Sequence, residues 1–164
     1  MRSLIKLIDG LTEIVGKLVS YIVYALLIVV VYEVISRKIF NSPTVWAFEL
    51  SYMLYGAMFM LGFGYALKYG SHVCIDVISN KFPPKTKAVL TMFTYLIFFF
   101  PFVYFGVKSS WQFFSQSWVM RELSQSPWAP PIYPFKFLMP LGFFLLGLQG
   151  ISEFIKQIYN LKGE

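Results

Sequence analysis

One short stretch of the chain contains residues of the types that bind metals and transfer protons. Residues 68–84, KYGSHVCIDVISNKFPP, include the only histidine and the only cysteine of the 164-residue chain, His72 and Cys74, followed by Asp76. Imidazole, thiolate and carboxylate groups are the usual protein ligands of zinc, which takes three or four of them. The residue types alone therefore admit a metal site or an acid–base pair.

The spacing of these residues argues against a shared metal site. Residues i and i+2 of a helix point about 200° apart, so Cys74 would face away from His72 and Asp76. Cys74 falls on the apolar face of such a helix, and we interpret it as a small hydrophobic residue. His72 and Asp76 lie one turn apart on another face. Pro83–Pro84 would end the segment. We predict an amphipathic helix over about 72–82, in which His72 and Asp76 stabilise the fold or contact a partner, and no metal is bound.

The composition indicates which elements surround this stretch. Hydrophobic residues make up 57% of the chain and charged residues only 13%, whereas a soluble domain is about a quarter charged. Four apolar stretches are long enough, with flanking lysines and arginines, to cross about 30 Å of hydrocarbon. We predict an all-α membrane protein with a single integral-membrane domain over residues 1–164. Its four transmembrane helices are expected at about 15–36, 46–67, 88–107 and 136–155.

The N-terminal residues show an amphipathic pattern of their own. Leu4, Leu7, Ile8 and Leu11, with Ile5 less regularly, form one apolar stripe. The charged residues of this segment fall elsewhere, a pattern typical of a helix that lies in the membrane interface. We expect such a helix at about 2–13, and no cleavable signal peptide.

The distribution of Lys and Arg predicts the orientation in the membrane, because these residues concentrate on the cytoplasmic side. The two terminal segments and the 68–87 connection must share one side, and they contain nine basic residues, against five on the opposite side. We therefore predict cytoplasmic N- and C-termini. Glu33, one turn before Arg37, is expected to pair with it.

Two features within the apolar helices predict local geometry. Pro101 lacks an amide N–H and should kink the third helix, with the freed carbonyl satisfied by neighbouring groups. Gly62 and Ala66 form a small-xxx-small pair, which permits the close approach of another helix.

The charges give little support to transport or catalysis by the chain alone. Ionisable groups are absent from the middle of every predicted transmembrane helix, where an active transporter usually has them. Glu33 and Glu49 lie near helix ends, where we interpret them as structural or partner contacts. A haem protein needs histidines in its helices, and a thiol oxidoreductase needs paired cysteines. We expect no enzyme, no cofactor and no nucleic-acid partner. An autonomous small exporter that uses Glu33 or Glu49, and a membrane-anchor subunit of a redox complex, remain as alternatives.

Three motifs resemble those of a known family. They are WAFELSY (46–52), GYALKYGSHVCID (64–76) and SQSPWAPPIYPFKFLMPLGF (124–143). Their order and spacing are similar to the small membrane subunit, or Q component, of tripartite ATP-independent periplasmic (TRAP) transporters, over about residues 30–155. Family positions correspond to Trp46 and Glu49, to Gly70, His72 and Asp76, and to Pro140, Leu141 and Gly142. Cys74 stands where the family often has a basic residue.

The resemblance implies a function for the chain. In that family a large membrane (M) subunit holds the substrate and sodium sites, a periplasmic protein delivers a small organic anion such as a carboxylate or sulfonate, and the small subunit braces the large one. A bacterial inner-membrane location follows. Large-subunit contact or a structural role is then expected of Glu33, Arg37, Trp46, Glu49, His72 and Asp76. Membrane lipid is expected between the subunits, because an apolar surface does not distinguish acyl chains from apolar helices.

Residues 108–134 form the longest connection outside the predicted helices. Trp111, Phe114 and Trp118 recur at helical spacing, so the first half should continue the third helix. Four prolines should prevent a helix in the second half. Either the aromatic residues hold this segment at the lipid headgroups, or it helps to dock the periplasmic binding protein through Arg121, Trp118 and Trp128.

Overall fold

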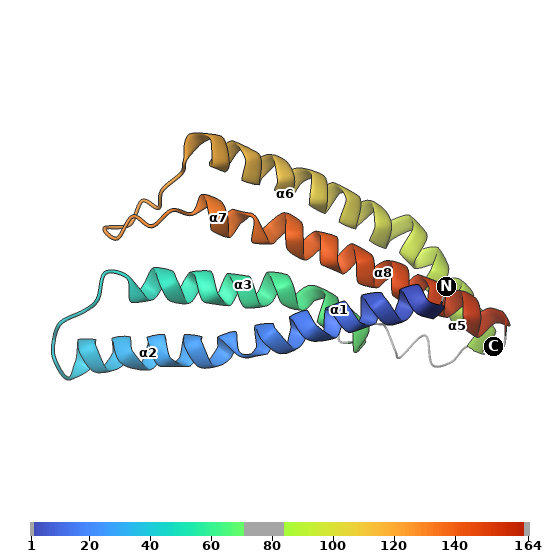
Figure 1. Cartoon of the computed structure of the whole chain (residues 1–164), viewed down its shortest axis with the longest axis horizontal. Helices are drawn as coiled ribbons and strands as arrows, with labels where there is room; N and C mark the ends of the chain where they lie inside the picture. The colour runs from blue at the N-terminus through green and yellow to red at the C-terminus, as the bar shows by residue number, and fades with distance from the viewer. Residues whose placement is uncertain (1, 71–83, 163–164) are drawn as a thin grey trace.

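The first membrane-spanning element consists of two helices in series. The computed structural model describes residues 2–70 and 84–162, beginning with helix α1 (Arg2–Ser20) and helix α2 (Ile22–Lys38), which are separated only by Tyr21. At this junction the amide of Tyr21 donates to the Leu18 carbonyl at 3.2 Å and that of Tyr24 donates to the Tyr21 carbonyl at 3.1 Å. Figure 1 shows α1 continuing the direction of α2. The N-terminal helix is therefore longer than the expected 2–13 and runs directly into the first span.

The second span, α3, covers Ala47–Lys68 and matches its predicted range within one residue. The hydroxyl of Thr44 accepts a hydrogen bond from the Ala47 amide at 3.3 Å, which satisfies a free donor at the start of the helix. The chain leaves α3 through Tyr69 and Gly70, and Gly70 has a φ of +67°. Glycine suits this left-handed conformation because it has no Cβ.

The third span contains a change of helix type next to its proline. Helix α5 (Pro84–Thr94) passes into a π-helical segment, η1 (Tyr95–Phe99), and then into α6 (Phe100–Met120). Pro101 lies just after the π-helical segment and has no amide N–H to donate to the preceding turn, so the hydrogen-bonding pattern of the helix changes next to the proline; the kink itself stays a prediction. Helix α6 runs to Met120, which also confirms that residues 108–120 continue the third helix.

The last span begins with a short helix, α7 (Tyr133–Lys136), followed by α8 (Leu138–Lys162). Within the described residues, four helical segments are long and apolar enough to cross a membrane: Ser3–Lys38, Ala47–Lys68, Ala88–Met120 and Tyr133–Tyr159. The predicted all-α fold with four transmembrane helices is confirmed, although the first, third and fourth segments are longer than expected.

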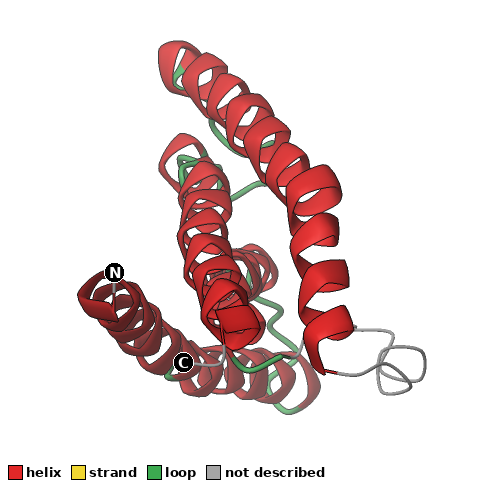
Figure 2. Ribbon diagram, turned by 90° about the vertical axis from the view of Figure 1, so that its right-hand side faces the viewer, coloured by secondary structure: helices red, strands yellow, loops and turns green. Residues whose placement is uncertain are grey.

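The spans form an open layer rather than a closed bundle. Helix α2 packs on α3, α3 packs on α8, and α8 packs on α6, while α1 contacts both α3 and α8. Figures 1 and 2 show this layer from two directions, with both termini at one end. We call that end the terminal end, and the end with the α2–α3 and α6–α7 connections the loop end. Such a layer leaves most apolar side chains exposed, and the core is small, consisting of Leu67, Val103 and Leu146 with neighbouring aromatic rings.

The close contact between α3 and α8 depends on glycines other than the predicted one. A Cβ at Gly142 would lie 2.6 Å from the Met60 carbonyl oxygen, and one at Gly64 would lie 3.4 Å from that of Leu145. Gly62 faces open space, with no other atom within 4 Å of its Cβ position. No helix among the described residues makes the predicted contact at Gly62, and the face of α3 that meets α8 includes Gly64 instead.

Candidate functional site: polar networks at the two ends of the layer

At the terminal end, α8 contributes a fully buried amide that joins it to α1. Gln149 has 0% of its surface exposed. Its Oε1 accepts a hydrogen bond from the Thr12 hydroxyl at 2.7 Å, while its Nε2 donates to Asp9 Oδ1 and to Glu153 Oε1, both at 3.0 Å. Both polar ends of the buried side chain are thereby satisfied, as burial in an apolar layer requires.

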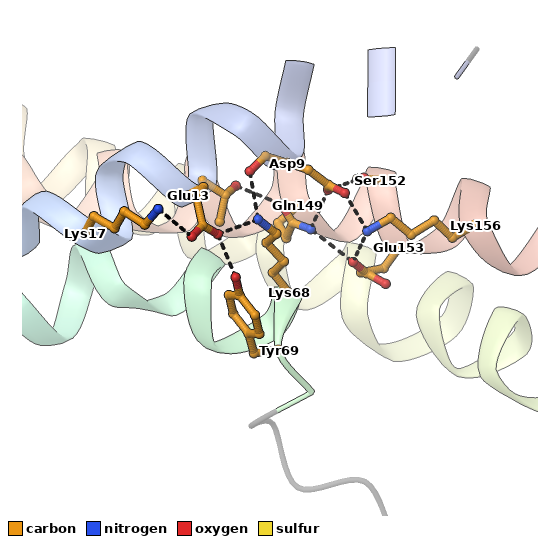
Figure 3. Close-up of polar contacts among 10 residues, drawn as sticks. Asp9, Glu13, Lys17, Lys68, Tyr69, Gln149, Ser152, Glu153 and Lys156 are labelled. Atoms are coloured by element: carbon orange, nitrogen blue, oxygen red, sulfur yellow. Dashed lines mark hydrogen bonds and ion pairs between the residues drawn. The ribbon is translucent and has the colours of Figure 1, made fainter. Parts of the chain in front are cut away.

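Ion pairs extend this network to α3 and along α8 (Figure 3). Lys156 Nζ lies 2.8 Å from Asp9 Oδ2 and 2.7 Å from Glu153 Oε1, and the Ser152 hydroxyl donates to Asp9 Oδ1 at 2.8 Å. From α3, Lys68 Nζ lies 2.6 Å from Glu13 Oε2. We call the set the terminal network; its members are Asp9, Thr12, Glu13, Lys17, Lys68, Tyr69, Gln149, Ser152, Glu153 and Lys156.

The terminal network is electrically balanced. Asp9, Glu13 and Glu153 supply three negative charges, and the three lysines in the list above supply three positive charges. The Tyr69 hydroxyl donates to Glu13 at 2.7 Å, and this bond raises the pKa of Tyr69 to about 12. The tyrosine therefore stays protonated. The arrangement neutralises the polar face of α1, which is why this helix packs against α3 and α8 instead of turning that face to water.

At the loop end, two predicted site residues form an ion pair within α2. Arg37 Nη2 lies 2.6 Å from Glu33 Oε1, which confirms the predicted pairing. The other oxygen of Glu33 accepts hydrogen bonds from the Thr44 hydroxyl and from the Thr44 amide, the latter at 3.2 Å. Glu33 therefore links the end of α2 to the residues that start α3. Trp46 stacks on Tyr32 with ring centroids 5.6 Å apart, next to this contact.

The second predicted carboxylate of the loop end, Glu49, accepts a hydrogen bond from the Ser126 hydroxyl. This contact joins the first turn of α3 to the α6–α7 connection. Glu122 in the same connection pairs with Lys136 of α7, and the hydrogen bond from Lys136 lowers the pKa of Glu122 below its usual value of 4.5. A bridge between Leu123 and Pro131 closes the connection on itself.

The predicted docking residues lie on this connection or beside it. The Arg121 guanidinium carbon lies 5.3 Å from the ring centroid of Trp118 and 5.4 Å from that of Tyr133. Trp118 continues a series of ring contacts along α6 through Phe114. Trp128 is partly exposed. The structure thus brings Arg121 and Trp118 into contact, whereas no hydrogen bond or ring contact among the described residues joins Trp128 to either.

The remaining predicted site residues belong to the stretch between α3 and α5. His72, Cys74, Asp76 and the expected 72–82 helix lie outside the described residues. In residues 2–70 and 84–162 no group of three or more His, Cys, Asp or Glu residues could hold a metal ion.

The terminal network was not predicted from the sequence. The signal that could have found it is the polar pair Gln149 and Ser152 in an otherwise apolar helix.

All six carboxylates in the described residues have a partner within the chain. Each accepts a hydrogen bond or forms an ion pair; they are Asp9, Glu13, Glu33, Glu49, Glu122 and Glu153. Carboxylates satisfied in this way hold helices together and have little remaining capacity for a cation or a polar ligand.

Comparison with known proteins identifies the family. A family model described as "Tripartite ATP-independent periplasmic transporters, DctQ component" matches residues 26–160. The sialic acid TRAP transporter small permease protein SiaQ of Vibrio cholerae is 29% identical in an alignment of 134 residues, which covers 70% of this chain and 76% of that protein. The sialic acid TRAP transporter permease protein SiaT of Haemophilus influenzae is 32% identical in an alignment of 107 residues, which covers 63% of this chain but only 17% of that longer protein. The chain is a multi-pass membrane protein that belongs to the DctQ-component family of tripartite ATP-independent periplasmic transporters.

Proposed function

We propose that the chain is an accessory subunit that braces a large permease subunit and does not itself bind the transported substrate. The observation that carries this proposal is the internal pairing of all six described carboxylates. The open layer supports it as well, because it leaves broad apolar surfaces that a larger membrane protein could cover. In this account the chain is not an enzyme and holds no cofactor.

The transported substrate is proposed to be a small organic anion, a carboxylate or a sulfonate. The two relatives are named for sialic acid, which is a sugar carboxylate. Import is proposed to be coupled to sodium at sites in the large subunit, with delivery by a periplasmic binding protein. The sites that choose the substrate would lie in those other proteins.

The orientation proposed from the basic residues places the terminal end in the cytoplasm and the loop end in the periplasm. Arg121, Trp118 and Trp128 would then lie on the side from which the binding protein arrives. Contact with the large subunit, or support of that contact, is proposed for Glu33, Arg37, Trp46, Glu49, His72 and Asp76. Lipid in the bacterial inner membrane is proposed to fill gaps between the subunits.

Assembly of the wild-type complex tests this proposal. The tagged chain is co-expressed with the large permease subunit of its transporter, and the two are purified from membranes in mild detergent. Retention of the large subunit through affinity and size-exclusion steps at a fixed ratio supports the proposal. A chain that purifies alone under conditions where the large subunit is folded and abundant contradicts it.

A further inference from the structure

Helices α1 and α2 pack on the rest of the layer through one regular seam. Half-buried or buried residues recur alternately three and four positions apart, beginning with Ile5, Ile8, Thr12, Val15 and Val19 and continuing from Ile22 to Ser36. This seam lies against α3 and, in its first half, also against α8. A spacing of three and four residues is that of the a and d positions of a left-handed helix pair.

A second seam with the same spacing runs along the outside of the same helices. In α1 it consists of Leu4, Leu7, Leu11, Ile14 and Leu18, all of them exposed. At 100° per residue, its centre lies about 100° around the helix from the inner seam. The seam passes the junction at Tyr21 without a change of register and continues through Ala25, Ile28, Tyr32 and Ile35, which are exposed too.

The remaining outward positions of α1 differ sharply from this second seam. Apart from the second seam, the exposed residues of α1 are Ser3, Lys6, Gly10, Lys17 and Ser20. A helix surrounded by lipid would be apolar at these positions also, as α2 is at Leu27, Val31 and Val34. The outward face of α1 is therefore an apolar stripe bounded by the inner seam on one side and by polar residues on the other, a form that suits pairing with another helix.

The length of the helix pair places the start of the stripe beyond the acyl chains. Ser3–Lys38 comprises 36 residues, or about 54 Å at 1.5 Å per residue, whereas the hydrocarbon is about 30 Å thick. Arg37 and Lys38 mark one boundary at the loop end. Even at a tilt of about 40°, only about 26 residues fit within the hydrocarbon, which leaves Leu4 and Leu7 outside it. Lipid tails do not cover these two leucines.

From these observations we infer that the outer seam of α1–α2 is the surface on which a long helix of the large subunit packs, continuing the layer beyond α2. The inference rests on the proposed function. A helix of the large subunit fits better than a second copy of this chain, because the Haemophilus relative contains the matched segment within one much longer permease chain. That arrangement supplies one large partner for each small one.

Single-cysteine photo-crosslinking in the assembled complex tests the inference. The only native cysteine is first removed by Cys74→Ser, and a benzophenone maleimide is attached at Ile14→Cys or Ile28→Cys. The matched controls are Gly10→Cys and Leu27→Cys, which are exposed on the same helices; Gly10 has no other atom within 4 Å of its Cβ position, Leu27 is 58% exposed and Ile28 is 68% exposed. Irradiated membranes are analysed for adducts with the large subunit.

The inference predicts adducts with the large subunit at positions 14 and 28 that are at least several times stronger than at 10 and 27. Equal adducts at all four positions, adducts with a second copy of this chain, or adducts with lipid alone at 14 and 28 would overturn it. The wild-type complex distinguishes the two proposals: if it does not assemble, the proposed function fails, and if it assembles but the seam does not crosslink, only this inference fails.

Charge substitution at the water-exposed start of the seam gives a second test. Leu7→Glu should weaken retention of the large subunit by about tenfold, because it places a charge in an apolar contact, while the chain remains folded because Leu7 is 67% exposed. Lys6→Glu, on the neighbouring polar edge, should retain the complex. Normal assembly of the Leu7→Glu variant would contradict the inference.

Discussion

The Gln149 side-chain amide donates to the Asp9 carboxylate at 3.0 Å, although the two residues belong to the last and the first helix of the chain. This bond and its neighbours add polar contacts to the apolar inner seam by which α1 packs on α3 and α8. Each of these groups would cost free energy if it were buried without its partner. The position of α1 therefore depends on a few buried polar side chains as well as on apolar packing, and the outer seam that it presents depends on them in turn.

The first prediction concerns Gln149. Gln149→Leu removes one acceptor and two donor contacts and leaves Thr12 and Asp9 with fewer partners. Loss of buried hydrogen bonds of this kind costs about 1–3 kcal/mol, so the melting temperature of the purified chain should fall. Gln116→Leu, at an exposed position of α6, is the matched control and should leave it unchanged. Equal melting temperatures for both variants would show that the network contributes little.

A second prediction follows from the lowered pKa of Glu122. A carboxylate with a lowered folded-state pKa stabilises the fold above its unfolded value of 4.5, and this contribution is lost as the pH falls through the folded pKa. Glu122→Gln should therefore melt below wild type at about pH 7, and the difference should shrink as the pH falls toward about 3. Thermal melts in detergent at several pH values measure this. A difference that does not change with pH would mean that the Glu122–Lys136 pair does not stabilise the α6–α7 connection.

The third prediction tests whether the α6–α7 connection docks the periplasmic binding protein. The Arg121 guanidinium lies over the rings of Trp118 and Tyr133, and the backbone of Arg121 itself has a φ of +48°. These ring contacts hold the side chain in position before any partner arrives. A preordered contact loses less entropy on binding. Arg121→Glu and Trp128→Ala should reduce uptake when binding protein is limiting and have less effect when it saturates. Normal uptake by both variants at limiting binding protein would leave the connection with a purely interfacial role.

The orientation is the subject of the fourth prediction. The basic residues predict a cytoplasmic terminal end, so a reporter that is active only in the periplasm should be silent after Leu161 and active within 120–126. Fusions at the two sites, normalised to protein amount, provide the measurement. A periplasmic signal at the C-terminal site would invert the map and move the proposed docking residues to the cytoplasm.

The sequence predicted the spans well, because the length of an apolar run is set by bilayer thickness and is visible residue by residue. The Glu33–Arg37 pair and the altered hydrogen bonding next to Pro101 were predictable for a similar reason, since both arise within one helix. The terminal network was not predicted, because it joins residues up to 143 positions apart, such as Asp9 and Ser152. The sequence also predicts that the apolar residues near the N-terminus share one face of the helix. In the structure Ile8 packs inward, while Leu4, Leu7 and Leu11 face outward. A spacing pattern cannot separate two adjacent seams without the helices that cover one of them.

Uptake by reconstituted subunits tests the central claim, that this chain braces a transporter and does not transport. The chain alone, the large subunit alone and the two together are placed in proteoliposomes with an inward sodium gradient, loaded binding protein and labelled organic anion. The account predicts no uptake by the chain alone, and uptake only when both membrane subunits are present. Sodium-dependent uptake by this chain alone, or full activity of the large subunit without it, would contradict the account.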